Sequence, residues 1–377
     1  LGANIIKIEP PSGGDQMRNR VLESQFSDIG MAAGFLAMNI GKRSLGLDIK
    51  SEKGKEILFA LIKKSDVILH NFRAGVVDRL GLDYESVRAI NPSIVYTVIS
   101  GYGAKGPRSA DPAYDGAVQA AAGMMANNGT AESGPLRTGY MPVDLMTGMT
   151  AAYATTAALL RKQKTGEGQM VDVAMLDCAI TLGSANFSRS EVDDIPDMLI
   201  GNQSITSAPT ASSFPTAEGS ILTAAIMPKH VEAFFDEIGL KEMLSDPKFA
   251  TREARIENKE IVRDAMIEAL KSDTAENWEK RLAPRGVPVA KINSVKETAR
   301  LEQLQYRNIL TAVPAAKGMA TGYKLPGAPF TNSEDGPEVM RPAPVLGQHT
   351  LEILEEIGIE KSIISTLAAE GVICKDD

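Results

Sequence analysis

Short runs of β-branched and apolar residues alternate with stretches of helical periodicity through the first half of the chain. This alternation is typical of a parallel α/β sheet, because parallel strands need a crossover connection between them. Residues 51–64 place apolar side chains at helical spacing, with Ser51 as the predicted N-cap. The strands predicted in this half are residues 5–9, 44–49, 66–71 and 94–100.

The pattern changes from residue 114 onward. Residues 114–125 and 145–162 are rich in Ala and Met with few charges, which favours buried helices. Residues 169–175 return to a strand pattern. Residues 186–215 are rich in Ser, Thr, Asp and Pro without a clear period, which indicates a crossing between domains, and residues 205–300 read as a smaller α+β unit.

Composition narrows the classes of function. The chain has 377 residues, 44% hydrophobic and 23% charged, and a formal net charge of -8. Such a chain is globular, with room for about two or three domains. Its acidity argues against a nucleic-acid partner, although a local cationic pocket for one phosphorylated ligand is compatible with it.

Cysteine and histidine usage predicts no metal site. Cys178 and Cys374 are too few for a disulfide framework or a Cys-based zinc site, and His70, His230 and His349 are widely separated. No window reaches about 18 consecutive apolar residues, and no charged-then-apolar leader is visible. We therefore expect a cytoplasmic protein without membrane contact.

Residues 101–106 match the dinucleotide-binding pattern G-x-G-x-x-G and follow a predicted strand. Pro107 and polar residues come next instead of a helix, so no helix N-terminus is available to hold a pyrophosphate. We interpret the segment as a turn and expect no tightly bound cofactor.

Asp144 stands between a loop and a long, nearly uncharged helical stretch. One interpretation is an N-cap for a helix that begins at Leu145. The other is a carboxylate nucleophile in a dry pocket, with Gly148 allowing close approach of a ligand. The two interpretations are compatible.

Five cations lie nearest to strand ends in the α/β half. Each alone is typical of a solvated surface charge. Together, at the carboxyl ends of parallel strands, they could hold a phosphate-bearing ligand. They are Lys42, Arg43, Lys50, Arg79 and Arg137.

Several strings, in order along the chain, resemble the class III coenzyme A transferases. This is the family of formyl-CoA transferase, carnitine CoA-transferase and α-methylacyl-CoA racemase. The strings are LGANIIKIE (1–9), GD (14–15), NIGKRS (39–44), NFRAG (71–75), RLG (79–81), PAYD (112–115), VD (143–144), KTGEGQ (164–169) and LGQHT (346–350).

The resemblance implies an α/β fold with a Rossmann-like large domain built from both ends of the chain, a smaller α+β domain, and an interlocked homodimer. The predicted domains are residues 1–185 for the first part of the large domain, 186–204 for a linker, 205–300 for the small domain, and 301–377 for a second linker and the rest of the large domain.

The family's nucleophilic aspartate falls on Asp144. The resemblance implies that its carboxylate attacks an acyl-CoA thioester to form a mixed anhydride, that the CoA thiolate returns to form an aspartyl-CoA thioester, and that an acceptor acid then takes the CoA. The substrates would be an acyl-CoA and a small carboxylic acid. The CoA-contacting positions fall on Leu47, Lys50, Asn71, Phe72 and Arg79.

Tyr114 and Asp115 favour transfer over racemisation. Racemases of this family carry a histidine where Tyr114 stands, whereas its transferases carry a tyrosine followed by an acid. A phenol with a pKa near 10 is a poor base for α-proton removal at neutral pH. We expect a transferase, with a racemase-like activity as the alternative.

The chain departs from the family pattern in three places. Nothing corresponds to the strand and helix that precede the LGAN string, so a truncated CoA-binding homologue without turnover is a further alternative. Pro10 replaces a basic residue. Residues 201–214 lack the glycine run that closes over the aspartate in formyl-CoA transferase, so different lid chemistry is expected.

Overall fold

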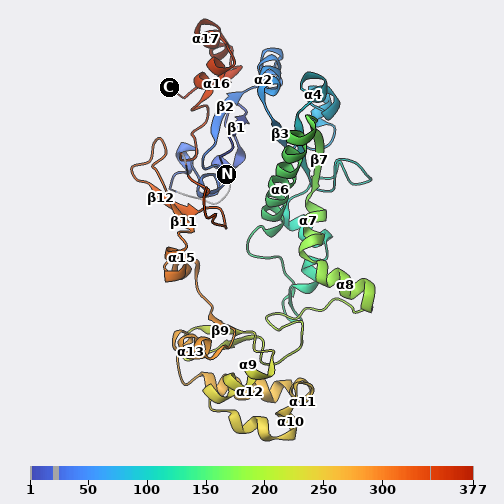
Figure 1. The fold of residues 1–377 in the computed structure, drawn as a ribbon, viewed down its shortest axis with the longest axis vertical. Coiled ribbons are helices and arrows are strands. Elements are labelled where there is room, and N and C mark those ends of the chain that lie inside the picture. The colour runs from blue at the N-terminus through green and yellow to red at the C-terminus, as the bar shows by residue number, and fades with distance from the viewer. Residues whose placement is uncertain (1, 20–24, 340, 377) are drawn as a thin grey trace. The chain divides into compact units, whose positions relative to one another are not determined.

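The computed structural model describes residues 2–19, 25–339 and 341–376, and the fold is mixed α/β as predicted (Figure 1). The chain divides into two compact units. The terminal unit comprises Leu1–Pro112, Thr147–Met175 and Ala299–Asp377, and the central unit comprises Ala113–Met146 and Leu176–Thr298. Three of the four divisions fall inside residues 1–185, the segment predicted as the first part of the large domain, and the fourth, after Thr298, falls near the predicted end of the small domain. The predicted domain limits stay a prediction.

Two sheets of the terminal unit are built mainly from parallel strands. Strand β1 (Ile6–Glu9) pairs in parallel with β2 (Arg43–Leu47), and β13 (Ile373–Cys374) adds to β2 in antiparallel. A second, all-parallel sheet has β4 at its centre, in the order β3-β4-β7. Its strands are β3 (Val67–His70), β4 (Val95–Ser100) and β7 (Gln169–Ala174). The parallel strands predicted from the hydrophobic pattern are confirmed.

Helix α2 (Glu52–Lys64) forms as its pattern predicts. The Ser51 hydroxyl accepts from the Gly54 N–H at 3.1 Å, which confirms the N-cap. Its apolar face joins one core with β2, β4 and the C-terminal helices. The other helices and strands of this unit are α1 (Ala33–Met38), α3 (Val76–Leu80), α4 (Tyr84–Ile90), α15 (Glu302–Tyr306), β11 (Leu310–Val313), β12 (Tyr323–Pro326), α16 (Thr350–Glu356) and α17 (Lys361–Ala369).

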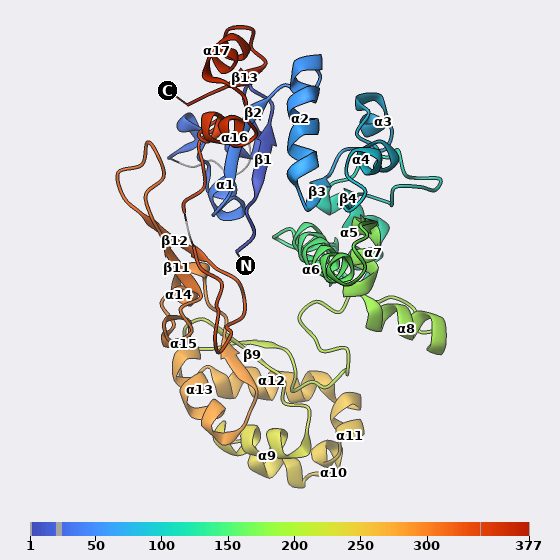
Figure 2. The ribbon, with the colours of Figure 1, turned by 45° about the horizontal axis from the view of Figure 1, so that its top comes forward.

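The central unit has a separate core, built around the antiparallel sheet β10-β9-β8. Phe214, Phe234, Phe235 and Trp278 fill this core, and Figure 2 shows α9, α12 and α13 gathered near β9. The helices and strands of its second segment are α7 (Met175–Leu182), α8 (Ser184–Asp193), β8 (Ser213–Pro215), β9 (Ser220–Thr223), α9 (Pro228–Glu237), α10 (Pro247–Ala250), α11 (Arg252–Glu257), α12 (Lys259–Leu270), α13 (Ala275–Leu282), β10 (Val289–Lys291) and α14 (Val295–Thr298).

Two helices predicted from Ala- and Met-rich stretches differ from expectation. The first is short: α5 (Asp115–Ala121) is followed by a 3-10 turn, Met124–Asn127, and by the small hairpin of β5 (Gly129–Thr130) and β6 (Gly134–Pro135). The second, α6 (Pro142–Thr165), is longer than predicted.

The expectation that residues 145–162 form a buried helix is wrong for one face of α6. Met149 and Tyr153 are 60% and 65% exposed, and Leu145 and Leu160 are also exposed. These four side chains follow one another at intervals of four or seven residues and so form one stripe along the helix. Among the described residues, this apolar face of α6 is exposed.

Candidate active site

Asp144 lies inside the first turn of α6 rather than before it. The helix begins at Pro142, whose missing N–H costs nothing at that position. The N–H groups of Val143 and Asp144 donate to the Oδ2 atom of Asp115, at 2.9 and 3.1 Å. The N-cap interpretation of Asp144 is therefore wrong. Asp115, from a distant part of the sequence, caps this helix, and the Asp144 carboxylate takes no part in the capping.

The capping carboxylate is itself held in place. Asp115 is only 6% exposed, at the start of α5, and its Oδ1 atom accepts from the Nε2 atom of Gln119 one turn later. Gln119 also donates to the Thr138 hydroxyl at 3.0 Å and accepts from the Thr138 N–H at 3.1 Å. This polar cluster fixes the loop that enters α6 against α5, so the backbone of Asp144 has a defined position.

Two effects raise the pKa of the Asp144 carboxyl group. The larger is desolvation by neighbouring atoms, even though the residue as a whole is exposed, and the second is repulsion from the Asp115 carboxylate. A carboxylate with a raised pKa is a better nucleophile in its ionised form. The site therefore has an accessible carboxylate with a raised pKa, at a helix start that is held in a defined position.

Tyr114 immediately precedes the capping residue. It occupies the N-cap position of α5 in an extended conformation, and its side chain is 70% exposed. The structure thus brings Asp115 into contact with the backbone of Asp144 and places Tyr114 next to Asp115 in the chain. All three residues belong to the central unit.

The predicted CoA-contacting residues all lie in the terminal unit. Asn71 and Phe72 directly follow β3, Lys50 lies exposed in the turn between β2 and α2, and Arg79 is exposed in the last turn of α3. These are positions at or beyond the carboxyl ends of parallel strands, where open α/β sheets bind ligands.

Leu47 is the exception among these residues. Its side chain is 1% exposed and packs in the core of the terminal unit. A ligand can therefore reach this residue only through its backbone, which sequence reasoning could not distinguish from a side-chain contact.

The hypothesis that five cations share a phosphate site is wrong for Arg43. Its guanidinium bonds the carboxylates of Glu352 and Glu356, each at 2.6 Å, and this pairing raises its pKa. Burial, together with the nearby charge of Lys7, lowers the pKa of Lys42 to about 8, and its Nζ atom donates to Asn39 at 3.1 Å. Arg43 is thus a structural ion-pair residue.

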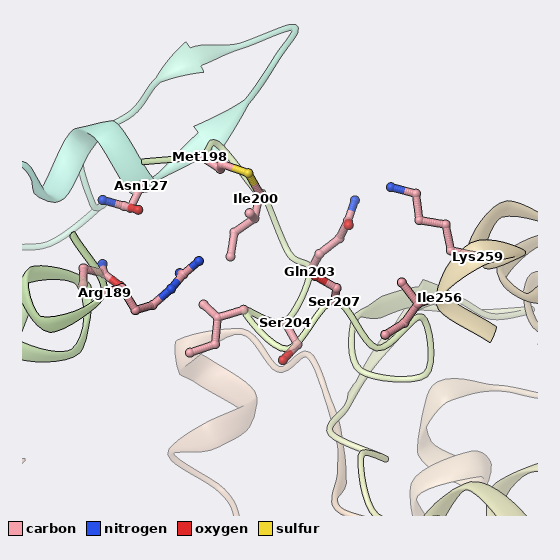
Figure 3. Close-up of a pocket in the computed structure, with 11 residues that line it drawn as sticks. Asn127, Arg189, Met198, Ile200, Gln203, Ser204, Ser207, Ile256 and Lys259 are labelled. Carbon is pink, nitrogen blue, oxygen red and sulfur yellow. The ribbon is translucent and has the colours of Figure 1, made fainter. Parts of the chain in front are cut away.

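A cavity of about 300 Å³ lies elsewhere in the central unit (Figure 3). Arg189 and Lys259 extend into it from different elements, and Ile200 and Ile256 are among its apolar lining residues. None of the predicted catalytic or CoA-contacting residues lines it.

Neither a candidate metal site nor a membrane-spanning helix is found among the described residues. Within 2–19, 25–339 and 341–376, no group of three or more His, Cys, Asp or Glu residues is placed to hold a metal ion. Across the same residues, none of the helices is both long enough and apolar enough to span a bilayer.

Comparison with known proteins identifies the class. Residues 1–350 match CoA-transferase family III. The chain belongs to this family and is a CoA-transferase, which confirms the resemblance predicted from the ordered strings. CoA thioesters are accordingly its class of substrate.

Curated relatives and solved structures agree over nearly the whole chain. The succinate–glutarate CoA-transferase of Agrobacterium fabrum is 31% identical over 95% of this chain and 89% of its own length. The acetyl-CoA:oxalate CoA-transferase of Acetobacter aceti is 33% identical over 94% and 89%. The crystal structure of a CAIB/BAIF family protein from Brucella suis is 28% identical, covers 95% of this chain and 92% of that one, and has a TM-score of 0.83.

Proposed function

We propose that this enzyme moves CoA from an acyl-CoA donor to a small carboxylic acid through covalent intermediates on Asp144. The observation that carries the proposal is the held position of Asp144: its backbone is fixed by the Asp115 carboxylate, and its own carboxyl group is exposed with a raised pKa. This aspartate also falls where the family's nucleophile stands.

The proposed path regenerates the enzyme. The Asp144 carboxylate attacks the thioester carbonyl, the carbon–sulfur bond breaks, and CoA leaves as a thiolate from a mixed anhydride. The thiolate attacks the aspartyl carbonyl of the anhydride and releases the donor acid. The acceptor carboxylate then attacks the carbonyl of the aspartyl-CoA thioester, the carbon–sulfur bond breaks, and CoA thiolate leaves from a second mixed anhydride. The thiolate attacks the acceptor's carbonyl in this anhydride, which forms the new acyl-CoA and releases the Asp144 carboxylate.

A carboxylate is a weak nucleophile, so alignment and oxyanion stabilisation must supply most of the rate. Holding the attacking group on a rigid helix start is one contribution to alignment. Water must also be excluded, because the anhydride hydrolyses readily. Two exposed apolar side chains can keep water from the site once a substrate or subunit covers them. They are Leu145, the residue directly after Asp144, and Met149, about one and a half turns beyond Asp144 along α6.

The acids named for the relatives indicate which substrates to test first. Succinate, glutarate and oxalate are all short dicarboxylates. We infer that the acceptor of this enzyme is a short dicarboxylic acid. For CoA, we infer contacts with Lys50, Asn71, Phe72 and Arg79, and with the backbone of Leu47. Arg79 suits phosphate, because a guanidinium can make two parallel hydrogen bonds to it.

Trapping the covalent intermediate tests the proposed function. The enzyme is incubated with succinyl-CoA, treated with borohydride or hydroxylamine, digested, and analysed by peptide mass spectrometry. We expect the modified peptide to contain Asp144. An unmodified Asp144 under conditions in which CoA moves from succinate to glutarate would overturn the covalent mechanism.

We also propose a Rossmann-like arrangement of the large domain and a homodimer. The all-parallel sheet β3-β4-β7 supports the former. The uncovered apolar stripe of α6 supports the latter, because monomeric proteins rarely leave a large contiguous apolar patch in water.

Replacing Met149 or Tyr153 with Glu should convert the proposed dimer to a monomer, since a carboxylate buried at the centre of an apolar interface loses its hydration. Light scattering after size exclusion measures the mass. The matched control is Gln163→Glu, which adds the same charge at an exposed position near the end of α6. A dimer that persists in Met149→Glu and Tyr153→Glu would place the subunit contact elsewhere.

A further inference from the structure

A chain of hydrogen bonds runs under the turn that follows β3. The Tyr96 hydroxyl donates to the Leu82 carbonyl at 2.7 Å and lies 2.7 Å from the Nε2 atom of His70. The Nδ1 atom of His70 accepts from the Phe72 N–H at 3.2 Å. Four residues from β3, β4 and the loops beside them are thus connected in one line.

These bonds fix the state of the imidazole. A carbonyl oxygen can only accept, so the single proton of the Tyr96 hydroxyl is committed to Leu82, and His70 must supply the proton between the two side chains. His70 therefore carries its proton on Nε2, and its Nδ1 lone pair faces Phe72. Burial lowers the pKa of His70 to about 4, which keeps this neutral form at physiological pH.

The register of the sheet explains how the two side chains meet. Tyr96 pairs with Ile68 across β3 and β4, and His70 lies two residues further along β3, on the same face of the sheet as Ile68. The rings of His70 and Tyr96 meet edge to face, with centroids 5.3 Å apart. Tyr96 is 2% exposed, so this part of the hydrogen-bonded series is packed rigidly inside the protein.

The Phe72 end of this series of hydrogen bonds is exposed to solvent. The ring of Phe72 stacks on His70 at 5.6 Å with an interplanar angle of 29°, and Phe72 is 38% exposed. An aromatic ring supported from one side and exposed on the remainder offers a platform for a flat base. At the other end of the chain, Leu82 follows α3, the helix that carries Arg79.

We propose that His70 and Tyr96 are positioning residues that hold the Phe72 ring as a platform for the adenine of CoA and tie that platform to the helix bearing Arg79. The inference rests on the proposed CoA contacts of Phe72 and Arg79. It adds a purpose to two residues that contact no proposed reacting group, and it explains why a neutral histidine ends β3.

Ligand fragments separate this role from a general effect on folding. Isothermal titration measures binding of CoA, of adenosine 3′,5′-bisphosphate, and of pantetheine, which lacks the nucleotide. His70→Leu removes both ring hydrogen bonds, and we expect binding of CoA and of the bisphosphate to weaken about tenfold, the size of one base–aromatic stacking contact. Pantetheine binding should stay as in the wild type.

Two further variants make the test specific. His70→Asn places an amide oxygen where it can accept from the Phe72 N–H, so it should recover most of the lost affinity for the bisphosphate. Tyr96→Phe should lose affinity in the same direction as His70→Leu. Its matched control is Tyr84→Phe, which removes a hydroxyl from the ring that meets Tyr96 edge to face at 5.6 Å and should bind like the wild type.

The outcomes distinguish this inference from the proposed function. If the wild type binds neither CoA nor the bisphosphate, the proposed CoA site and the inference both fail. If the wild type binds both while folded His70→Leu keeps full affinity for the bisphosphate, only the inference is overturned. An equal loss for pantetheine and the bisphosphate would show a general structural role and would also overturn it.

Discussion

Asp144→Asn should abolish CoA transfer while leaving the fold intact. An amide does not attack a thioester, so we expect transfer to fall by at least about 10³-fold, as for loss of a covalent nucleophile in other enzymes. The backbone N–H of residue 144 can still donate to Asp115, and Asn has the same shape as Asp. Chromatography of the CoA esters formed from succinyl-CoA and glutarate measures the rate, and thermal melting checks the fold.

Asp264→Asn is the matched control, because Asp264 is an exposed aspartate on α12 of the same unit. It should transfer CoA at the wild-type rate. A folded Asp144→Asn enzyme that keeps more than about a tenth of the wild-type rate is incompatible with an obligatory covalent step on this residue.

The hydrophobic pattern predicted the parts of the fold that local sequence determines. Each parallel strand is a short apolar run, and α2 has its cap and its apolar face within one segment, so periodicity was sufficient. Asp144 could be chosen as the candidate nucleophile because an acid beside a long uncharged stretch is unusual, and because the ordered strings matched a family; its role stays a prediction. These signals are all continuous along the chain.

The start of α6 could not be predicted in the same way. Its cap comes from Asp115, 29 residues before Asp144, and a contact of that separation leaves no periodic trace. One signal was available: Gln119 lies four residues after Asp115, the spacing at which helical side chains interact. Sequence reasoning missed Gln119 and its partner Thr138.

The exposed face of α6 and the buried Leu47 mark a second limit. An apolar helix pattern is the same whether the surface that packs on it lies in the same chain or in another. The pattern of α6 therefore predicted burial but not which surface covers the helix. At Leu47 the resemblance gave a position in contact with CoA, whereas only the packed structure shows that its side chain is inside the core.

Asp115 should control both the stability of the helix start and the acid limit of activity. Asp115→Ala leaves the N–H groups of Val143 and Asp144 without their acceptor, and we expect a loss of about 2 kcal/mol in the free energy of unfolding.

Asp115→Asn keeps an acceptor oxygen but removes the negative charge that helps to raise the pKa of Asp144. The nucleophile must be ionised, so activity falls as the pH drops through that pKa.

Removing the charge of Asp115 should therefore lower the pKa of Asp144 and extend activity to more acidic pH. Rates of CoA transfer measured from about pH 4 to 8, bracketing the ordinary carboxyl range, give the acid limb for the wild type and for Asp115→Asn. Desolvation, the larger cause of the raised pKa, is unchanged in the variant, so the limb should move only part of the way towards the ordinary aspartate value. A limb that stays in place, or moves to higher pH, would mean that the two carboxylates are not coupled in the working enzyme.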